Sequence, residues 1–516
     1  MTVKSLIKTS EYHDSVSLML VAKELVNFAG VKDASVMMGT DSNKSLLEQS
    51  GLLTAEAQAA SPNDLIIAVN TDGDADAALA EAEALLNKKA EASETSEFRP
   101  KTVRGAKKAH PNANVAIISI AGRYAADEAW ECLLQGMHVL LFSDNVSKED
   151  ELALKKYGRD HGLLVMGPGA GTAILNGVAL AFANVIPAGP VGIVSAAGTG
   201  LQETSTLLAK NGVGITQGIG TGGGDVKKEI GGIMYIEGLK ALQADPATKV
   251  ILMVSKLPDV EVEQLLLEQV KASQKPTVIC LLGGKARASE LPANAIVVST
   301  LEEAGLTAAK LAGAAIGDIQ QTIRAEAEEA KEQAEGLKKL LKPGQKHLRG
   351  LFSGGTLCYE SQVIWRDNFE LEIYSNAPLD KHYKMKDATH SEGDCVVDLG
   401  EEEFTVGRPH PMIDNDLRIR RILQEAADPT VAVIMLDVVI GYGAHPDPAA
   451  ELGDAILRAR RAAHDEGREV LFVASVTGTE DDPQCLSRTT EKLQAAGVHV
   501  LKSNAMASRL AGYLIS

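Results

Sequence analysis

The fold is decided by a stretch that occurs twice, first as Gly192-Ile193-Val194-Ser195-Ala196-Ala197-Gly198-Thr199-Gly200-Leu201-Gln202-Glu203. It returns as Gly350-Leu351-Phe352-Ser353-Gly354-Gly355-Thr356-Leu357-Cys358-Tyr359-Glu360. Both copies pass from a short apolar segment through a turn of small residues into a helix, and both keep the spacing Gly-Thr-x-x-x-Glu. Apolar runs of this kind are typical of buried strands in a parallel sheet.

The sequence downstream of the two stretches matches as well. Asp245-Pro246 precedes the apolar run Val250–Val254, and Asp428-Pro429 precedes the apolar run 431–436. A repeat with so long a period predicts two similar domains in one chain.

Apolar runs alternate with helical patterns along the chain, which predicts an α/β fold with parallel sheets. Strands are expected at 3–8, 34–38, 65–70, 115–120, 139–142, 163–166, 191–195, 250–255, 277–282 and 295–299. Helices are expected at 14–29, 75–89, 125–135, 148–161 and 318–341. The polar stretch 90–114 has the composition of a linker. We therefore expect domains at 1–95, 110–187, 188–316 and 346–516, with 317–345 as a helical linker.

Composition narrows the classes of function. The 516 residues carry a net charge of -18 and are only 4% aromatic, so a nucleic-acid partner is not expected. The chain has no apolar run of about 18 residues and no signal-peptide pattern at its start, so we expect a cytoplasmic protein without a membrane partner.

The five cysteines are far apart and form no Cys-x-x-Cys pair, so we expect neither a disulfide framework nor a metal site. Buried free thiols are the simplest interpretation. Cys358 differs because it follows the second Gly-Thr turn, where a helix N-terminus could lower the pKa of the thiol.

The two turns are candidate anion sites, because glycines allow close approach to the backbone and the first N–H groups of a helix favour negative charge. The predicted phosphate- or carboxylate-binding residues are Ser195, Gly198, Thr199, Ser353, Gly354, Gly355 and Thr356. A strand-to-helix turn also needs Gly and an N-cap Ser or Thr for structural reasons alone. The presence of two equivalent turns favours ligand binding.

Two further loops carry glycine. The segment 214–225 contributes Gly220, Gly222 and Gly223 as candidate ligand contacts, with a mobile loop as the alternative. The run 166–172 follows the C-terminal end of a predicted strand, where ligands bind in open α/β sheets.

A stiff loop at 407–414 holds two prolines together with Arg408 and His410. We predict Arg408 as the cation that neutralises substrate charge and His410 as the acid/base. A hydrogen-bonded structural role for His410 is about equally consistent with the sequence.

At this point the motifs resemble a known family. Residues 166–254 resemble the α-subunit of succinyl-CoA synthetase, and the region from His347 onward is similar to the C-terminal ligase domain of its β-subunit. The whole chain resembles the FdrA family of acyl-CoA synthetase-like proteins, on the segments 141–147, 349–358 and 407–414. The resemblance implies a Rossmann-like CoA-binding-type domain followed by two flavodoxin-like ligase-type domains, after a small N-terminal α/β domain.

The chain departs from that family at several functional positions. It has no histidine between His161 and His347, which excludes the family's phosphohistidine relay after the strand 277–282, and it has no ATP-grasp segment. The Gly-rich CoA loop should precede Val115, yet 97–114 holds only Gly105, so no cofactor is certain and CoA stays an open candidate. Gly169-Ala170 stands where the family commonly has Asp-Cys.

The FdrA resemblance implies a subunit of an oxamate carbamoyltransferase in allantoin-type nitrogen catabolism. We therefore predict carbamoyl or acyl transfer, with carbamoyl phosphate, an acyl phosphate or a carboxylate as the small anionic substrate and with partner subunits, or further copies of this chain, in the assembly. The alternatives are an acyl-CoA synthetase subunit without a phosphohistidine and a non-catalytic regulatory or scaffolding subunit.

Overall fold

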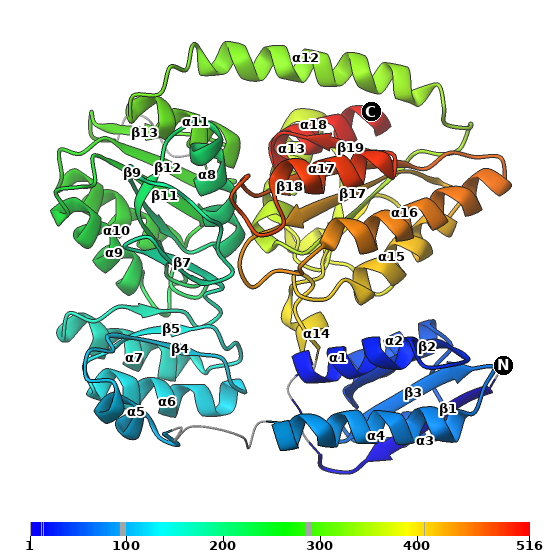
Figure 1. Ribbon diagram of the computed structural model, residues 1–516. Helices are drawn as coiled ribbons and strands as arrows, with labels where there is room; N and C mark the ends of the chain where they lie inside the picture. The colour runs from blue at the N-terminus through cyan, green and yellow to red at the C-terminus, as the bar shows by residue number, and fades with distance from the viewer. Residues whose placement is uncertain (1, 12, 14, 93–99, 285–290, 407) are drawn as a thin grey trace. The chain divides into compact units, whose positions relative to one another are not determined.

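The computed structural model describes residues 2–11, 13, 15–92, 100–284, 291–406 and 408–516. These residues form two compact units. One unit comprises Met1–Arg99 and Leu399–Arg420, and the other comprises Pro100–Asp398 and Arg421–Ser516. Figure 1 labels the helices and strands of both units.

The first unit is built on a small antiparallel sheet with the strand order β1-β3-β2. The predicted elements are present as β1 Thr2–Lys8, α1 Ser15–Val26, β2 Val31–Met38, β3 Leu65–Thr71 and α4 Ala75–Ala92. Two short helices that the sequence did not predict, α2 Asp41–Gln49 and α3 Ala55–Ala59, lie between β2 and β3. Leu18, Leu25 and Ile67 belong to the apolar core between the sheet and its helices.

The segment Leu399–Arg420 groups with this first unit, although the sequence placed it inside the domain 346–516. It contains α14 (Glu402–Thr405) and the first turns of α15 (Asp416–Ala427). A bidentate ion pair, at 2.9 and 3.0 Å, joins Arg420 to Asp33 of β2. The sequence could not predict that this segment belongs with the first unit, because an ion pair between residues so far apart leaves no signal in the local sequence pattern.

The second unit begins with three parallel strands in the order β4-β5-β6. The elements are α5 Val103–Ala109, β4 Val115–Ile118, α6 Gly122–Leu134, β5 His138–Leu141, α7 Lys148–Asp160 and β6 Val165–Met166. Helix α5 lies within the predicted linker 90–114, so the linker prediction was wrong there. Thr102 caps this helix by accepting the N–H of Gly105, a capping pattern that the polar composition concealed.

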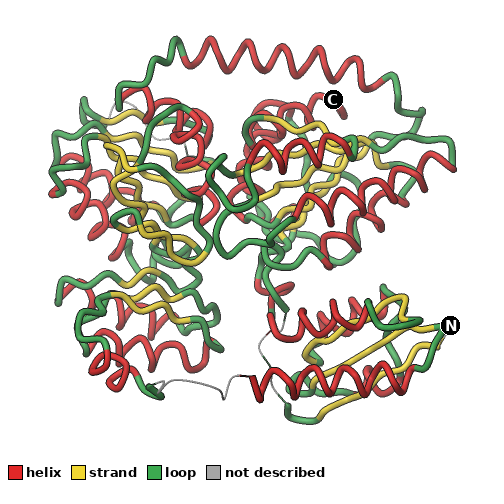
Figure 2. The backbone as a smooth tube through the Cα atoms, viewed as in Figure 1, coloured by secondary structure: helices red, strands yellow, loops and turns green. Residues whose placement is uncertain are grey.

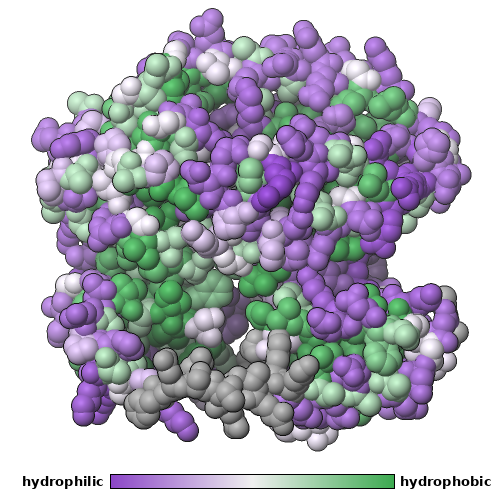
Figure 3. All heavy atoms as spheres, in the orientation of Figure 1, coloured by the Kyte–Doolittle hydropathy of each residue, from purple (hydrophilic) through white to green (hydrophobic). Residues whose placement is uncertain are grey.

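This sheet corresponds to one half of a Rossmann fold, since a complete one has two such halves and binds its ligand where the strand order reverses. The described three-stranded sheet contains no reversal, and β4 lies at its edge. Ile117 and Ile120 beside that edge are 52% and 45% exposed. Figure 3 shows apolar side chains gathered over this part of the molecule.

The first ligase-like domain follows as a seven-stranded sheet with the order β13-β12-β11-β9-β10-β7-β8. Its parallel strands are β9 Ala188–Ser195, β10 Ile215–Gly220, β11 Val250–Lys256, β12 Thr277–Leu282 and β13 Ala295–Val297. Strands β7 (Thr172–Leu175) and β8 (Val178–Ala181) add an antiparallel hairpin. Its helices are α8 Gly198–Lys210, α9 Ile233–Ala244, α10 Val260–Lys271 and α11 Leu301–Leu311.

The second ligase-like domain repeats this topology in the order β15-β16-β14-β17-β18-β19. The strands are β14 His347–Phe352, β15 Tyr374–Ser375, β16 Cys395–Asp398, β17 Val431–Val439, β18 Leu471–Thr477 and β19 Val498–Leu501. Its other helices are α13 Gly355–Phe369, α16 Pro448–Asp465, α17 Leu486–Ala495 and α18 Asn504–Ile515. In both domains the five core strands take the flavodoxin order 2-1-3-4-5, which confirms the predicted fold class and the repeat.

The predicted linker helix is present as α12 (Ile319–Lys338), which Figure 2 shows as one unbroken helix. Ala330 and Ala334 are its buried residues, and the rest of its surface is mostly polar. Among the described residues, no helix combines the length and apolar character needed to cross a membrane.

Candidate functional site

The two predicted turns meet in the second unit. Helices α8 and α13 start close together: the N–H of Thr356 donates to Oγ1 of Thr199 at 3.3 Å. A Cβ on Gly354 would lie 2.8 Å from the side chain of Thr199. The structure thus brings Ser195–Thr199 and Ser353–Thr356 into one place between the two ligase-like domains.

The glutamates of the repeat hold the two domains together. Glu203 of α8 accepts the N–H of Asn504 at 3.1 Å, at the start of α18 in the other domain. Glu360 of α13 reciprocally accepts the N–H of Leu301 at 2.6 Å, at the start of α11. Each glutamate therefore caps the last helix of the opposite domain, so the shared Gly-Thr-x-x-x-Glu spacing reflects a symmetric interface.

The start of α8 has free hydrogen-bond donors. Among the described residues, the N–H groups of Gly198, Thr199 and Gly200 have no acceptor. The N-cap residue Ala197 provides no side-chain cap, and the Ser195 hydroxyl is engaged with the backbone of Ala197 at 2.8 and 3.0 Å. Three free N–H groups at the positive end of a helix favour an anion.

The start of α13 is different, because the protein supplies its own anion there. Asp437 of β17 accepts the N–H of Ser353 through Oδ1 and that of Gly354 through Oδ2, both at 2.7 Å. The Ser353 hydroxyl also bonds this carboxylate, at 3.1 Å. The two predicted turns are therefore unequal. The sequence contained a signal for this role, since Asp437 is the one charge in the apolar run of β17.

Cys358 does not have the reactive environment that its position suggested. It is 1% exposed, and burial raises the pKa of its thiol well above the usual range, with the charge of Asp398 acting in the same direction. The prediction of a thiol activated by the helix N-terminus was therefore wrong, because desolvation outweighs the helix dipole.

The glycines at 220–223 are explained mainly by close packing of the backbone. A Cβ on Gly220 would lie 2.0 Å from the carbonyl oxygen of Thr172, and one on Gly222 would lie 2.5 Å from that of Pro168. Gly222 also has φ +84, which side chains other than glycine rarely adopt. Gly223 differs, because a Cβ added there would have the carbonyl oxygen of Ala196, 3.8 Å away, as its nearest neighbour.

A matched pair of variants tests this packing explanation. We expect Gly222→Ala to lower the free energy of unfolding by about 2 kcal/mol, because it combines a backbone clash with an unfavourable φ. Gly223→Ala should change it by less than about 0.5 kcal/mol. Scanning calorimetry on both variants measures the difference. Equal melting temperatures for the two variants would contradict the packing explanation.

The predicted catalytic residues Arg408 and His410 belong to the first unit, whereas both helix starts belong to the second. Arg408 pairs with Asp416 at 3.0 Å, and Nδ1 of His410 accepts the N–H of Met412 at 3.2 Å. Burial, with a smaller effect from the Arg418 charge, lowers the pKa of His410 to about 4. The imidazole is therefore neutral at pH 7 and a weak base.

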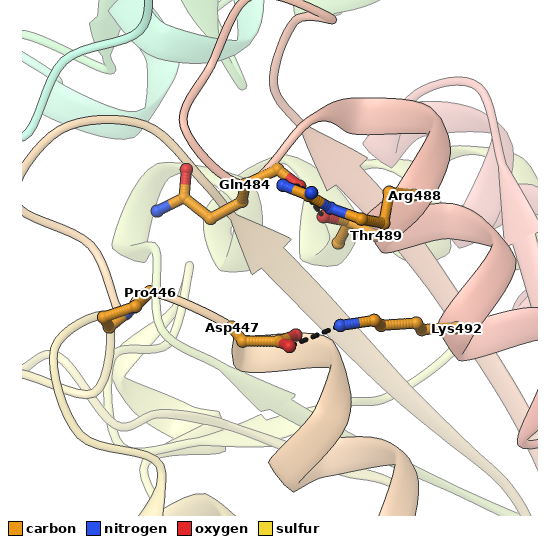
Figure 4. Close-up of a pocket in the computed structure, with 6 residues that line it drawn as sticks. All are labelled: Pro446, Asp447, Gln484, Arg488, Thr489 and Lys492. Carbon is orange, nitrogen blue, oxygen red and sulfur yellow. Dashed lines mark hydrogen bonds and ion pairs between the residues drawn. The ribbon is translucent and has the colours of Figure 1, made fainter.

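A pocket of about 250 Å³ lies in the second ligase-like domain, between the start of α16 and α17. Its lining residues, drawn in Figure 4, are Pro446, Asp447, Gln484, Arg488, Thr489 and Lys492. Lys492 pairs with Asp447, whereas the Arg488 guanidinium bonds only main-chain carbonyls of Pro483 and Gln484 among the described residues. The pocket is thus weakly basic. The sequence did not reveal it, because its lining residues come from two segments, 446–447 and 484–492, that are far apart in the chain.

Comparison with known families gives two matches. Residues 351–514 match the family described as CoA-ligase, and residues 1–101 match the family described as AllF, heavy metal-associated domain. Residues 1–101 contain no cysteine, so they do not fit a thiolate site for a soft metal. No cluster of three or more His, Cys, Asp or Glu suited to a metal occurs in the part of the chain that the structure describes.

Among known proteins, the chain is 41% identical to the uncharacterized protein YahF of Escherichia coli K12 over 519 residues, which covers 99% of this chain and 98% of that one. It is 27% identical over 179 residues to the succinate–CoA ligase [ADP-forming] subunit alpha 1 of Archaeoglobus fulgidus, covering 34% of this chain and 60% of that subunit.

Among solved structures, PH0766 from Pyrococcus horikoshii is 15% identical, with a TM-score of 0.34 and coverage of 82% of this chain and 87% of that one. The identity to YahF over nearly the full length is what decides the family. The chain therefore belongs to the same family as YahF, a family of proteins resembling succinyl-CoA synthetase in which an AllF-type N-terminal domain precedes a CoA-ligase domain.

Proposed function

We propose that the chain is a subunit of an acyl-CoA synthetase-like enzyme and that it holds the phosphate or carboxylate of its substrate at the start of α8. One observation carries the proposal: three N–H groups, on Gly198, Thr199 and Gly200, have no acceptor among the described residues. They lie where two ligase-like domains meet, beside Thr356. Fixed N–H donors stabilise negative charge that develops on a transferring acyl or phosphoryl group.

This proposal replaces carbamoyl transfer as the preferred activity. The relatives that support an activity are named as CoA ligases, and the family matched by residues 351–514 is described in the same terms. The comparisons give carbamoyl phosphate no support. They favour the acyl-CoA synthetase subunit, which was the alternative raised by the sequence.

A partner subunit is part of the proposal. Rossmann folds bind a nucleotide-like cofactor at the point where the strand order reverses. The described half-sheet β4-β5-β6 ends at β4 and contains no such point. We propose that CoA, if the reaction uses it, is bound mainly by residues outside this half-sheet. The relative from Archaeoglobus fulgidus is itself named as a subunit.

Replacing Gly198 by proline tests the anion site. Proline is well tolerated at the first position of a helix and removes only the N–H of that residue. The preceding residue, Ala197, already has an extended conformation (φ -138, ψ 101), as a residue before proline requires. We expect Gly198→Pro to weaken the binding of inorganic phosphate, measured by titration calorimetry, by about tenfold or more.

Gly198→Ala is the matched control, because it keeps the N–H. Its Cβ would lie 3.5 Å from Oγ1 of Thr172, which is ordinary van der Waals contact, so phosphate should bind as in the wild type. If the proline variant has the same melting temperature and binds phosphate equally well, the anion site lies elsewhere.

A further inference from the structure

The pocket beside α17 lies at an edge of the sheet where α/β proteins bind ligands. Its walls are the loop 440–447 after β17, the turn 478–485 after β18, and α17 itself. Strands β17 and β18 are parallel neighbours, so both connections leave from their carboxyl ends, and open parallel sheets bind their ligands at this edge. The lining residues belong neither to the start of α8 nor to that of α13, so the pocket is separate from the proposed anion site.

One side chain fixes two of these walls against each other. Gln484 is 4% exposed, and its Nε2 donates to the carbonyl oxygens of Gly441 and His445, both at 3.0 Å. Its Oε1 accepts the N–H of Gly441, also at 3.0 Å. These three bonds join the turn after β18 to the loop after β17. The pocket is therefore a formed part of the fold, as ligand sites usually are.

Arg488 brings a positive charge that the described chain does not balance. Its Nε donates to the carbonyl oxygen of Gln484 at 3.0 Å, and its Nη2 donates to those of Pro483 and Gln484 at 3.0 and 2.9 Å. These neutral acceptors fix the orientation of the guanidinium without compensating its charge. Because a guanidinium has five N–H groups, the two on Nη1 are left without an acceptor among the described residues.

Lys492 and Asp447 contribute the other charges of the pocket. Lys492 lies four residues after Arg488, which places both on one face of α17. Figure 4 shows the two side chains extending from the helix in the same direction, and Lys492 pairs there with Asp447 at the start of α16. The six lining residues thus carry two positive charges and one negative charge, which leaves one positive charge to be balanced.

The size and lining of the pocket limit the class of ligand. Its volume of about 250 Å³ is below the roughly 300 to 1,000 Å³ of sites for drug-sized ligands, so a nucleotide or CoA is too large to be enclosed by it. Five of the six lining residues are polar or charged, with Pro446 as the apolar exception. A small polar molecule therefore suits the pocket better than an apolar one.

We infer that this pocket binds a small, polar carboxylic acid, with its carboxylate between Nη1 of Arg488 and Nζ of Lys492. One carboxylate balances the one remaining positive charge, and hydrogen bonds from charged donors to a carboxylate are stronger than bonds between neutral groups. Asp447 can accept an O–H group of the same ligand. The inference goes beyond the proposed function, because it assigns the chain a second ligand site.

Chemical modification of Arg488 in the full-length protein tests the inference. Phenylglyoxal reacts with accessible guanidinium groups, and peptide mass spectrometry measures each arginine separately. Lactate carries a carboxylate and a hydroxyl group, whereas lactamide has nearly the same shape without the charge. With a Kd on the order of 1 mM, lactate at about 10 mM should slow the modification of Arg488 about tenfold at constant ionic strength. Lactamide should slow it less than about twofold.

Arg458 is the control within the same experiment. It is exposed on α16 and pairs with Asp454 at 3.4 Å, so neither compound should change its rate of modification. Equal protection of Arg488 by lactate and lactamide would overturn the inference, and so would the absence of protection by lactate. Equal protection of Arg488 and Arg458 would indicate a general effect of the anion and would overturn it as well.

Two charge variants should shift the half-protecting concentration of lactate in opposite directions. Asp447→Asn keeps the N-cap of α16, because Asn caps a helix as well as Asp does, and it adds one positive charge to the pocket. About threefold less lactate should then protect Arg488, whereas Lys492→Gln should require about threefold more. Lys228→Gln, which breaks a surface ion pair with Glu261, is the control and should cause no shift. Shifts of the same sign in the two pocket variants would contradict the inference.

Gly198→Pro keeps this inference distinct from the proposed function. It removes an N–H group at the start of α8 and leaves the pocket intact, so lactate should protect Arg488 in this variant as in the wild type. Loss of protection in Gly198→Pro would show that the two places are one site and would overturn the inference. Absence of protection in the wild type overturns the inference alone, since phosphate binding at α8 is measured separately.

Discussion

Glu360→Gln is expected to be more stable than the wild type at pH 9 and of similar stability at pH 5. Burial raises the pKa of Glu360 from 4.5 to about 8, although hydrogen bonds from Asn504 and Leu301 act in the opposite direction and the nearby charge of Glu203 adds to the rise. Glutamine has the size of the protonated carboxyl group and cannot ionise, so it avoids the buried charge at high pH.

The direction of the pH dependence follows from proton binding. The unfolded chain releases this proton near pH 4.5 and the folded chain near pH 8, so the folded state holds the extra proton between these values. Stability from this group is fully present below pH 4.5 and is lost as the pH rises through 8. Because a tenfold change in proton affinity is about 1.4 kcal/mol, the wild type should lose roughly 4 to 5 kcal/mol across this range.

Thermal unfolding of both proteins between pH 5 and pH 9 measures the effect. The glutamine can still accept the N–H of Leu301 through its Oε1, as the glutamate does. Glu335→Gln on the exposed surface of α12 is the control for the loss of one carboxylate, and it should follow the wild type at every pH. A Glu360→Gln variant that loses stability with pH as steeply as the wild type would refute the assignment.

The sequence was sufficient to predict the sheets and their repetition, because buried parallel strands and strand-to-helix turns are local patterns. Glu203 and Glu360 follow their Gly-Thr pairs at the same spacing, which revealed that the two domains are related. The role of the two glutamates depended on Asn504 and Leu301, which are far away in the chain. Local patterns do not show which helix end a buried carboxylate will cap.

The same limit applies to the candidate site. Ser353 and Gly354 look like an anion cradle until Asp437, 84 and 83 residues later, occupies their N–H groups. Gly220 and Gly222 look like ligand contacts until the carbonyl groups of Thr172 and Pro168 are placed against them. In each instance a distant part of the same protein takes the role that the local pattern had left for a ligand.

The loop that follows β10 is held by a buried lysine. Lys155 of α7 is 0% exposed, and its Nζ donates to Oε1 of Glu151 at 2.7 Å and to the carbonyl oxygen of Thr221 at 3.0 Å. It also pairs with Asp225 at 3.0 Å. Asp225 in turn accepts the N–H groups of Met234 and Tyr235 at the start of α9. One ammonium group thus joins α7, the glycine loop and α9.

Lys155→Met is therefore expected to lower the free energy of unfolding by about 3 to 5 kcal/mol, because it leaves two buried carboxylates without their cation. Burial already raises the pKa of Glu151 despite the lysine beside it, which shows how strongly this environment disfavours an unpaired charge. Scanning calorimetry should show a fall of several degrees in melting temperature. Lys156→Met is the matched control, because the neighbouring side chain is exposed and its loss should have little effect.

Neutralising the carboxylates distinguishes charge from packing. Adding Glu151→Gln and Asp225→Asn to Lys155→Met removes the uncompensated charges while keeping nearly the same volume, so most of the lost stability should return. If the triple variant is no more stable than Lys155→Met, the lysine acts through packing alone. A Lys155→Met variant as stable as Lys156→Met would show that the loop does not depend on this ion pair, and the close fit of Gly220 and Gly222 would then have to hold it in place.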